Sequence, residues 1–197
     1  MARSRFTDAA GFSLAEVMVA SCILCVGLVS LAQLFAISTR GNAAARSNTF
    51  TVILAQQKME QLRGLTWGFD TIGLPISDTS TDLSAVGTQA GCPAPSGGRG
   101  AGLTASPSGS LGANDDGWVD YLNMDGCVLS GGGSPPQGTA YIRRWSVEPL
   151  PTNPNNTLIL QVLVFKNRDR GTAADAGNVA RLPEEARLVS VKTRKMK

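Results

Sequence analysis

Few residue types in this chain of 197 residues could do chemistry. It contains no histidine, which excludes a histidine-based catalytic triad, metal site or proton shuttle. Four aspartates between Asn114 and Asp125 could suggest calcium, but their spacing does not fit an EF-hand loop, and we expect them to form turns. Its four cysteines form two separated pairs, Cys22 with Cys25 and Cys92 with Cys127. No catalytic constellation is visible, so we expect a protein without enzymatic activity, cofactor or metal.

One carboxylate lies immediately before an apolar segment. Glu16 immediately precedes the run from Val17 to Thr39, in which no residue is charged. Burying a carboxylate in such surroundings is costly unless a cation pairs with it. The pattern therefore predicts that Glu16 has a specific partner.

The residues around Glu16 form a recognisable string, Gly11-Phe12-Ser13-Leu14-Ala15-Glu16-Val17. It resembles the class III signal of type IV prepilins and type II secretion pseudopilins. The resemblance implies that a membrane aspartic peptidase cuts between Gly11 and Phe12 and methylates the new N-terminus at Phe12. Gly11 suits such a cut because it has no Cβ. Glu16 would then pair with the N-terminal amine of a neighbouring subunit, which sets the axial register between their helices.

The charge-free run is long enough to cross a bilayer. As a helix, Val17 to Thr39 would extend roughly 35 Å. Arg3 and Arg5 precede it and favour a cytoplasmic N-terminus with the remainder exported. An ordinary secretory signal has a shorter apolar core. A lipoprotein signal ending at Cys22 is disfavoured because most of the apolar run follows that cysteine.

The helix is expected to continue past the apolar run, from about Leu14 to Arg63. Gly64 is the expected C-cap. We expect an apolar face formed by Ala45, Val52, Ala55, Met59 and Leu62, with Gln56, Lys58, Gln61 and Arg63 largely off it. The stretch Leu54 to Arg63 resembles the end of this helix in the minor pilins called pilus modification protein PilV.

A small antiparallel sheet is expected after a loop-rich middle. Residues 72 to 138 are rich in Gly, Pro and Ser. Strands are predicted at Thr139 to Glu148, at Leu158 to Phe165 as a strand covered on both faces, and at Ala186 to Thr193 with Val189 and Val191 inward. The Pro- and Asn-rich residues 149 to 156 predict a turn that joins the first two strands in an antiparallel hairpin. A shorter strand is expected near Tyr121 to Leu129. The fold class is therefore α+β, and the resemblance implies the type IV pilin fold.

The two cysteine pairs are expected in different surroundings. Cys92 and Cys127 would lie on the exported side, where disulfides form, and we predict one bridge between them. Cys22 and Cys25 lie inside the apolar run and are interpreted as small apolar side chains. The basic tail after Arg181 is interpreted as a solvated strand face rather than a site for DNA or lipid.

The predicted organisation has five parts: a leader (1–11), a transmembrane or filament-core half-helix (12–39), an amphipathic half-helix (40–66), a variable loop region (67–137) and a sheet domain (138–197). By resemblance, the partners are the prepilin peptidase, other pilin or pseudopilin subunits and the inner-membrane assembly platform. A net charge of +3 gives little reason to expect nucleic acid. The alternatives are a minor pseudopilin, a pilus-displayed adhesin or DNA receptor, and a single-span periplasmic protein that is never processed.

Overall fold

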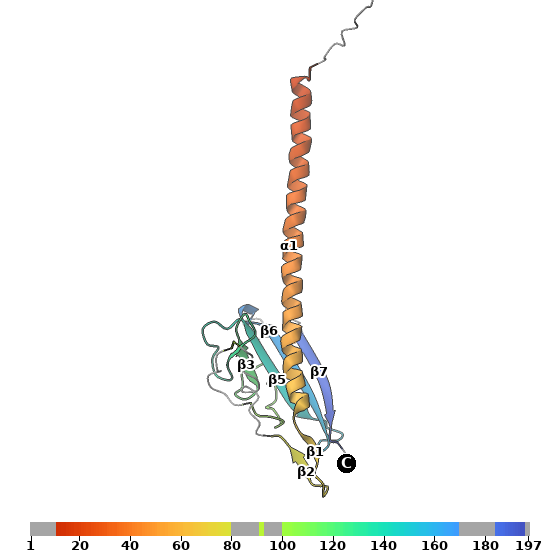
Figure 1. The fold of residues 1–197 in the computed structure, drawn as a ribbon, viewed down its shortest axis with the longest axis vertical. Helices are drawn as coiled ribbons and strands as arrows, with labels where there is room; N and C mark the ends of the chain where they lie inside the picture. The colour runs from red at the N-terminus through yellow and green to blue at the C-terminus, as the bar shows by residue number, and fades with distance from the viewer. Residues whose placement is uncertain (1–10, 80–90, 93–99, 170–183, 196–197) are drawn as a thin grey trace, which may run out of the picture. The chain divides into compact units, whose positions relative to one another are not determined.

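The computed structural model describes residues 11–79, 91–92, 100–169 and 184–195. The chain forms two compact units, Met1–Ala45 and Arg46–Lys197. One helix, α1 (Leu14–Gly64), runs through both, as the apolar run and the amphipathic segment after it predict. The sheets belong to the second unit, so the fold is α+β and is consistent with the type IV pilin fold (Figure 1).

The main sheet is antiparallel and has the strand order β4-β3-β5-β6-β7. Its central hairpin is the predicted one: β5 (Tyr141–Pro149) pairs with β6 (Thr157–Lys166) across the Pro-rich turn. The edge strand β7 (Ala186–Thr193) has the predicted bounds. A 3-10 turn, η1 (Asn167–Asp169), follows β6.

The middle of the chain contains more strands than its composition predicts. The single strand expected near Tyr121 to Leu129 is instead a hairpin of β3 (Val119–Leu122) and β4 (Val128–Ser130). A separate small hairpin joins β1 (Trp67–Phe69) to β2 (Pro75–Ser77). The sequence did not predict these strands because each is only three or four residues long and lies within a Gly-rich region typical of loops.

The helix packs on one face of the main sheet, but the face differs from the predicted one. Ala55, Met59 and Leu62 are buried as expected, whereas Ala45 and Val52 are exposed. The remaining buried positions are Ser47, Thr51, Leu54 and Lys58. The prediction that Lys58 lies off the packed face is therefore wrong, because a carboxylate of the sheet accommodates its charge.

The strand covered on both faces is β5, and the prediction of such a strand at β6 is wrong. Tyr141, Trp145 and Val147 face the helix side and belong to the main apolar core. On the opposite face, Arg144 donates hydrogen bonds to Asn114 Oδ1 and the Leu111 carbonyl, which holds a loop over the strand. In β6, by contrast, alternate residues are only half-buried.

The prediction for β7 has the right bounds but the wrong face. Val189 and Val191 are 61% and 60% exposed. Ala186 and Leu188 pack against the core instead, and Lys192 lies on that same side of the strand. Both faces of this strand carry aliphatic residues, so alternation alone left the inward face ambiguous.

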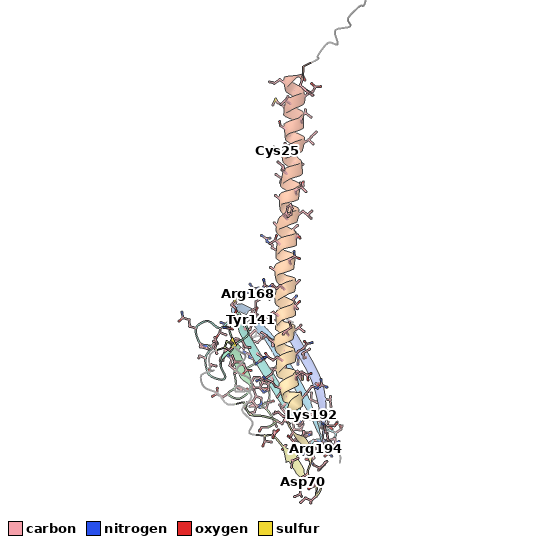
Figure 2. The ribbon with its side chains drawn as sticks, in the orientation of Figure 1. Cys25, Asp70, Tyr141, Arg168, Lys192 and Arg194 are labelled. Atoms are coloured by element: carbon pink, nitrogen blue, oxygen red, sulfur yellow. A yellow bond between two sulfur atoms is a disulfide. The ribbon has the colours of Figure 1, made fainter. Side chains whose placement is uncertain are left out.

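Two basic residues near the end of the chain bind the last turn of the helix and the strand after it (Figure 2). Lys192 Nζ donates to the Arg63 carbonyl at 2.5 Å, which satisfies a helix-end acceptor. Gly64 does not adopt the left-handed conformation expected of a glycine C-cap. Arg194 stacks on Trp67, with 3.7 Å from its Cζ to the ring centre, and donates to the Gly68 carbonyl.

Candidate functional site

The segment expected to be processed lies immediately before α1. Gly11, Phe12 and Ser13 are exposed and precede the first helical residue, Leu14. No atom from elsewhere in the described chain lies within 4 Å of the Cβ position that a side chain at Gly11 would occupy. Phe12 is 88% exposed. The peptide bond between Gly11 and Phe12 is thus open to another protein.

Glu16 has a partner within its own chain. Its Oε2 accepts the backbone N–H of Ser13 at 2.8 Å, and the Ser13 Oγ accepts the backbone N–H of Glu16 at 3.2 Å. This reciprocal pair is a capping box, which satisfies two donors at the start of a helix. The S-x-x-E spacing of Ser13 and Glu16 is the local signature of such a box, whereas the partner expected for Glu16 was only the amine of a neighbouring subunit. In the single chain, the Glu16 carboxylate caps the helix.

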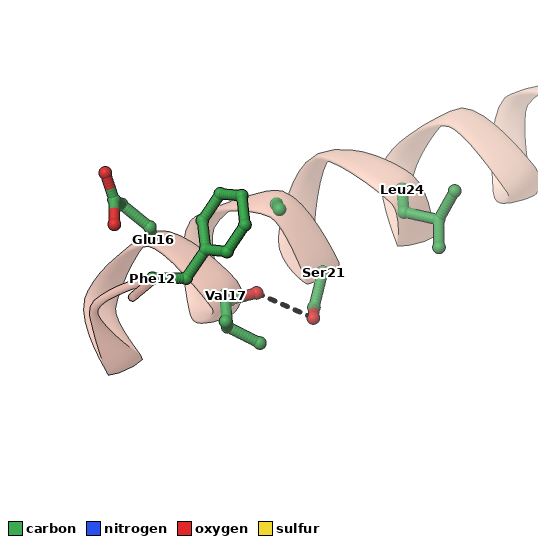
Figure 3. A pocket seen from close by; sticks show the side chains of 6 residues that line it. Phe12, Glu16, Val17, Ser21 and Leu24 are labelled. Carbon is green, nitrogen blue, oxygen red and sulfur yellow. Dashed lines mark hydrogen bonds between the residues drawn. The ribbon is translucent and has the colours of Figure 1, made fainter. Parts of the chain in front are cut away.

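An apolar hollow runs along the first turns of the helix beside Glu16 (Figure 3). Most of its lining is apolar, and it is made by Phe12, Glu16, Val17, Ala20, Ser21 and Leu24. The hollow places the carboxylate at the border of an apolar surface, with the Phe12 side chain beside it. Such a surface suits contact with another apolar helix.

The first half of α1 presents apolar side chains on every side. Large aliphatic and aromatic residues from Phe12 to Ile37 are more than half exposed. The helix is long and apolar enough to cross a membrane, with a mean hydropathy of 2.3 in its most apolar window. Exposed apolar surface of this extent requires lipid or protein around it. The helix could therefore be a membrane anchor.

Hydroxyl groups within the apolar half-helix are largely satisfied by their own backbone. Ser21, Ser30 and Thr39 each donate to the carbonyl four residues earlier, at 2.8 to 2.9 Å. Figure 3 shows the bond from Ser21 to Val17. These bonds lower the cost of placing a hydroxyl in an apolar environment.

A buried ion cluster joins the helix to the sheet in the second unit. Asp120 Oδ2 on β3 lies 2.8 Å from Lys58 Nζ and 2.7 Å from Arg143 Nη2. All three side chains are at most 1% exposed. Arg143 also donates to the Leu54 carbonyl of the helix at 3.1 Å, and Lys58 Nζ lies 3.7 Å from the centre of the Trp145 ring.

The cluster keeps Asp120 ionised. Burial by itself would raise the pKa of the Asp120 carboxyl, but the charges and hydrogen bonds of Lys58 and Arg143 outweigh it and hold this pKa below its ordinary value. Two cations share one carboxylate, so the cluster carries excess positive charge. The sequence pattern did not predict the cluster, because Lys58 was expected to lie off the packed face and no role was expected for Arg143.

The predicted disulfide is present. Cys92 and Cys127 are bonded, with their Cα atoms 5.5 Å apart. Cys22 and Cys25 are free and exposed on the apolar half-helix, where Figure 2 labels Cys25.

The expectation that the aspartates form turns holds for Asp115, whose carbonyl accepts the Trp118 N–H, and for Asp125, whose N–H donates to Asn123 Oδ1. It is wrong for Asp120, which lies buried on β3 because two cations pair with it.

Comparison with known proteins adds no relative: no family model, curated protein or solved structure matches this chain.

Proposed function

We propose that this chain is a minor type IV pilin-like subunit that acts by assembly and has no catalytic activity of its own. The observation that supports the proposal most strongly is the start of α1 at Leu14, directly after the segment expected to be cleaved. An exposed Gly11-Phe12-Ser13 segment leads directly into a helix whose third residue is Glu16 and whose first half is apolar on all sides. The same helix then packs on an antiparallel sheet, as in the pilin fold.

In the proposed mechanism, a prepilin peptidase cuts between Gly11 and Phe12 and leaves the apolar helix in the mature protein. The inner membrane holds the subunit until the assembly platform moves it into a pilus, among other pilin subunits. The released amine at Phe12 of one subunit then binds the Glu16 carboxylate of a neighbouring subunit. There it displaces the Ser13 N–H of that neighbour, which donates to the same carboxylate in the single chain. Both bonds have the ionised carboxylate as acceptor, but the ammonium brings a full positive charge where the Ser13 N–H is an uncharged donor, so the ion pair is expected to be the stronger of the two.

The exposed position of Gly11 supports the cleavage step, because a protease needs an extended and accessible peptide. The Cys92–Cys127 disulfide supports export of the second unit to an oxidising compartment. Both observations are also compatible with a minor pseudopilin of a type II secretion system, which uses the same N-terminal chemistry.

N-terminal sequencing tests the proposal. The full chain is expressed with and without a prepilin peptidase, and the membrane-bound product is sequenced. We expect a mature chain that starts at a methylated Phe12 only when the peptidase is present. A chain that keeps its leader, or starts at any other residue, would remove the basis of the proposal. Association with pilus or secretion components, measured by co-purification, then separates the two assembly systems.

A further inference from the structure

The last strand of the main sheet has an open edge. β7 ends the strand order, with β6 on one side and, among the described residues, no strand beside Ala186–Thr193 on the other (Figure 1). The Arg194 N–H donates to the Asn156 carbonyl at 2.8 Å, so alternate residues of β7 from Ala186 onward direct their backbone groups at β6. The groups that point away from β6 belong to Arg187, Val189, Val191 and Thr193. We call the backbone N–H and C=O groups of these four residues the β7 edge.

The β7 edge lacks the usual protection of a sheet edge. Native edge strands are commonly very short, or they contain a bulge or a proline. At the opposite edge of the sheet, β4 has three residues and its register with β3 is irregular. β7, by contrast, has eight residues, no proline and an unbroken register with β6. An open strand of this length is a template for the addition of another strand.

The fold itself adds backbone at one end of this edge. The Lys195 N–H donates to the Trp67 carbonyl at 3.2 Å, and Lys195 forms an isolated parallel bridge with Gly68. The first residues of β1 therefore occupy the place of the next strand just after β7 ends. The part that stays open, residues 187 to 193, extends roughly 20 Å, the length of an ordinary strand.

The side chains along β7 define the chemistry of a strand that would fit. Val189 and Val191 are mostly exposed and would pack against apolar side chains directly opposite them. Residues 186 to 195 include four cations and no carboxylate. Burial and the nearby cations lower the pKa of Lys192, which reflects this excess of positive charge. Carboxylates on an added strand would compensate it.

We propose that the β7 edge binds an extended, acidic segment of another protein as an added antiparallel strand. The residues opposite Val189 and Val191 would each exchange a pair of hydrogen bonds with the edge, and carboxylates would lie beside Arg187 and Lys192. The β7 of a second copy fits less well, because it carries the same positive charge. An antiparallel pair of β7 strands would also direct the α1 helices of two copies, which run alongside the strands, in opposite directions (Figure 1).

A synthetic peptide tests the hydrogen-bonding pattern. The full chain in detergent micelles is titrated with a dye-labelled heptapeptide, Thr-Glu-Val-Thr-Val-Thr-Glu, and binding is followed by fluorescence anisotropy. We expect saturable binding that weakens as salt is added. Methyl groups on the amide nitrogens of the two valines, which would face the edge, should weaken binding about tenfold or more. Methyl groups on the two threonines between and after the valines are the matched control, because those nitrogens would point away from β7.

Variants of the chain locate the binding site. Val189→Pro removes one N–H of the β7 edge and leaves the bonds to β6 in place, because the Val189 N–H points away from β6. It is expected to weaken peptide binding about tenfold. Val189→Thr keeps the N–H and the branched shape, and should bind within about threefold of the unchanged protein. Circular dichroism checks that both variants are folded, and the comparison of methylated peptides uses the unchanged protein.

The inference is overturned if the two methylated peptides bind equally, if the unmethylated peptide shows no saturable binding, or if a peptide with lysines in place of the glutamates binds as tightly. Self-association of the chain that Val189→Pro abolishes would assign the edge to a second copy instead. The inference concerns the second unit and uses the uncleaved chain. Peptide binding by a chain that is never cut after Gly11 would therefore support it while the proposed function fails.

Discussion

Lys58 Nζ lies 2.8 Å from Asp120 Oδ2, and the two side chains are 0% and 1% exposed. The pair joins the helix to β3, and Arg143 on β5 shares the same carboxylate oxygen. Because two cations surround one anion, removal of the anion and removal of one cation are not equivalent. The cluster therefore predicts an asymmetry between variants.

We expect Asp120→Asn to lower the free energy of unfolding by about 3 to 5 kcal/mol, because it leaves two buried cations without a carboxylate. Lys58→Met is expected to cost less, because it leaves Asp120 paired with Arg143 and replaces the ammonium with an apolar group of similar length. Urea unfolding of the full chain in detergent, followed by tryptophan fluorescence, measures both. The control is Glu60→Gln, which breaks the exposed pair with Arg63 and should change stability by less than about 1 kcal/mol. Equal costs for Asp120→Asn and Glu60→Gln would contradict the structural role of the cluster.

The acid stability of the domain should depend on Asp120. Its pKa in the folded chain lies below the ordinary value, so acid favours the unfolded chain, which binds the proton more readily. The contribution is present above about pH 4 and is lost as the pH falls through the folded-state pKa. Unfolding free energies measured from about pH 5 downward, across the ordinary carboxyl range, should fall more steeply for the unchanged protein than for Asp120→Asn. Glu184, whose pKa is also lowered, is retained in both proteins. Parallel slopes would count against this assignment.

The disulfide should stabilise the second unit measurably. Its cysteines are separated by 35 positions, and closing a loop of that length contributes roughly 3 to 4 kcal/mol, chiefly by restricting the unfolded chain. Cys127→Ser is expected to lower the unfolding free energy by that amount, and a reducing agent should have the same effect on the unchanged protein. The paired variant Cys22→Ser/Cys25→Ser serves as the control and should unfold at the unchanged denaturant concentration.

The two roles of Glu16 can be separated by comparing both members of its capping box. Ser13→Ala removes the hydroxyl of the cap but keeps the carboxylate and the backbone N–H that it accepts. If Glu16 pairs with an amine of a neighbouring subunit, Glu16→Leu should abolish incorporation into filaments, and Ser13→Ala should preserve most of it. Sheared pilus fractions, probed for the chain, measure incorporation. The same loss in both variants would assign Glu16 to helix capping alone.

The outward face of β7 should tolerate polar residues. Val189 and Val191 are mostly exposed, so Val189→Ser and Val191→Ser are expected to change the unfolding free energy by only about 0.5 kcal/mol. Leu160 on the neighbouring strand is fully buried, and Leu160→Ala should cost about 2 to 5 kcal/mol. Thermal unfolding followed by circular dichroism compares them. A large loss in the valine variants would mean that this face packs against something in solution.

Much of the fold could be predicted from local patterns. The uninterrupted apolar run and the amphipathic segment after it predicted one helix, and the structure has it at Leu14–Gly64. The turn at residues 149–156 predicted the β5–β6 hairpin. These predictions succeeded because helix continuity and tight turns depend on residues close together in the sequence.

The errors arose where distant residues decide burial. Lys58 was expected off the packed face because a lysine is normally solvated. Its burial is stabilised by Asp120, which lies far along the chain in sequence. Val189 and Val191 were placed inward because valine favours the core, while the inward face of β7 is set by its register with β6. The capping box at Ser13 and Glu16 is different: it is a local motif that the sequence could have predicted.

The ion cluster also has a mechanical consequence. Lys58 contacts its carboxylate at one position along the helix. Among the described residues, the carboxylate of Glu184 also contacts this part of α1, but it does so at Ser47, about three turns from Lys58, so no carboxylate receives Lys58 one turn away. The strands of the main sheet run alongside this part of α1 (Figure 1). A pull along the helix axis therefore acts on the cluster in shear, and sliding by even one turn would strand a charge in an apolar interior. The cluster thus fixes the axial position of the helix on the sheet, and tension applied to the helix is transmitted to the sheet.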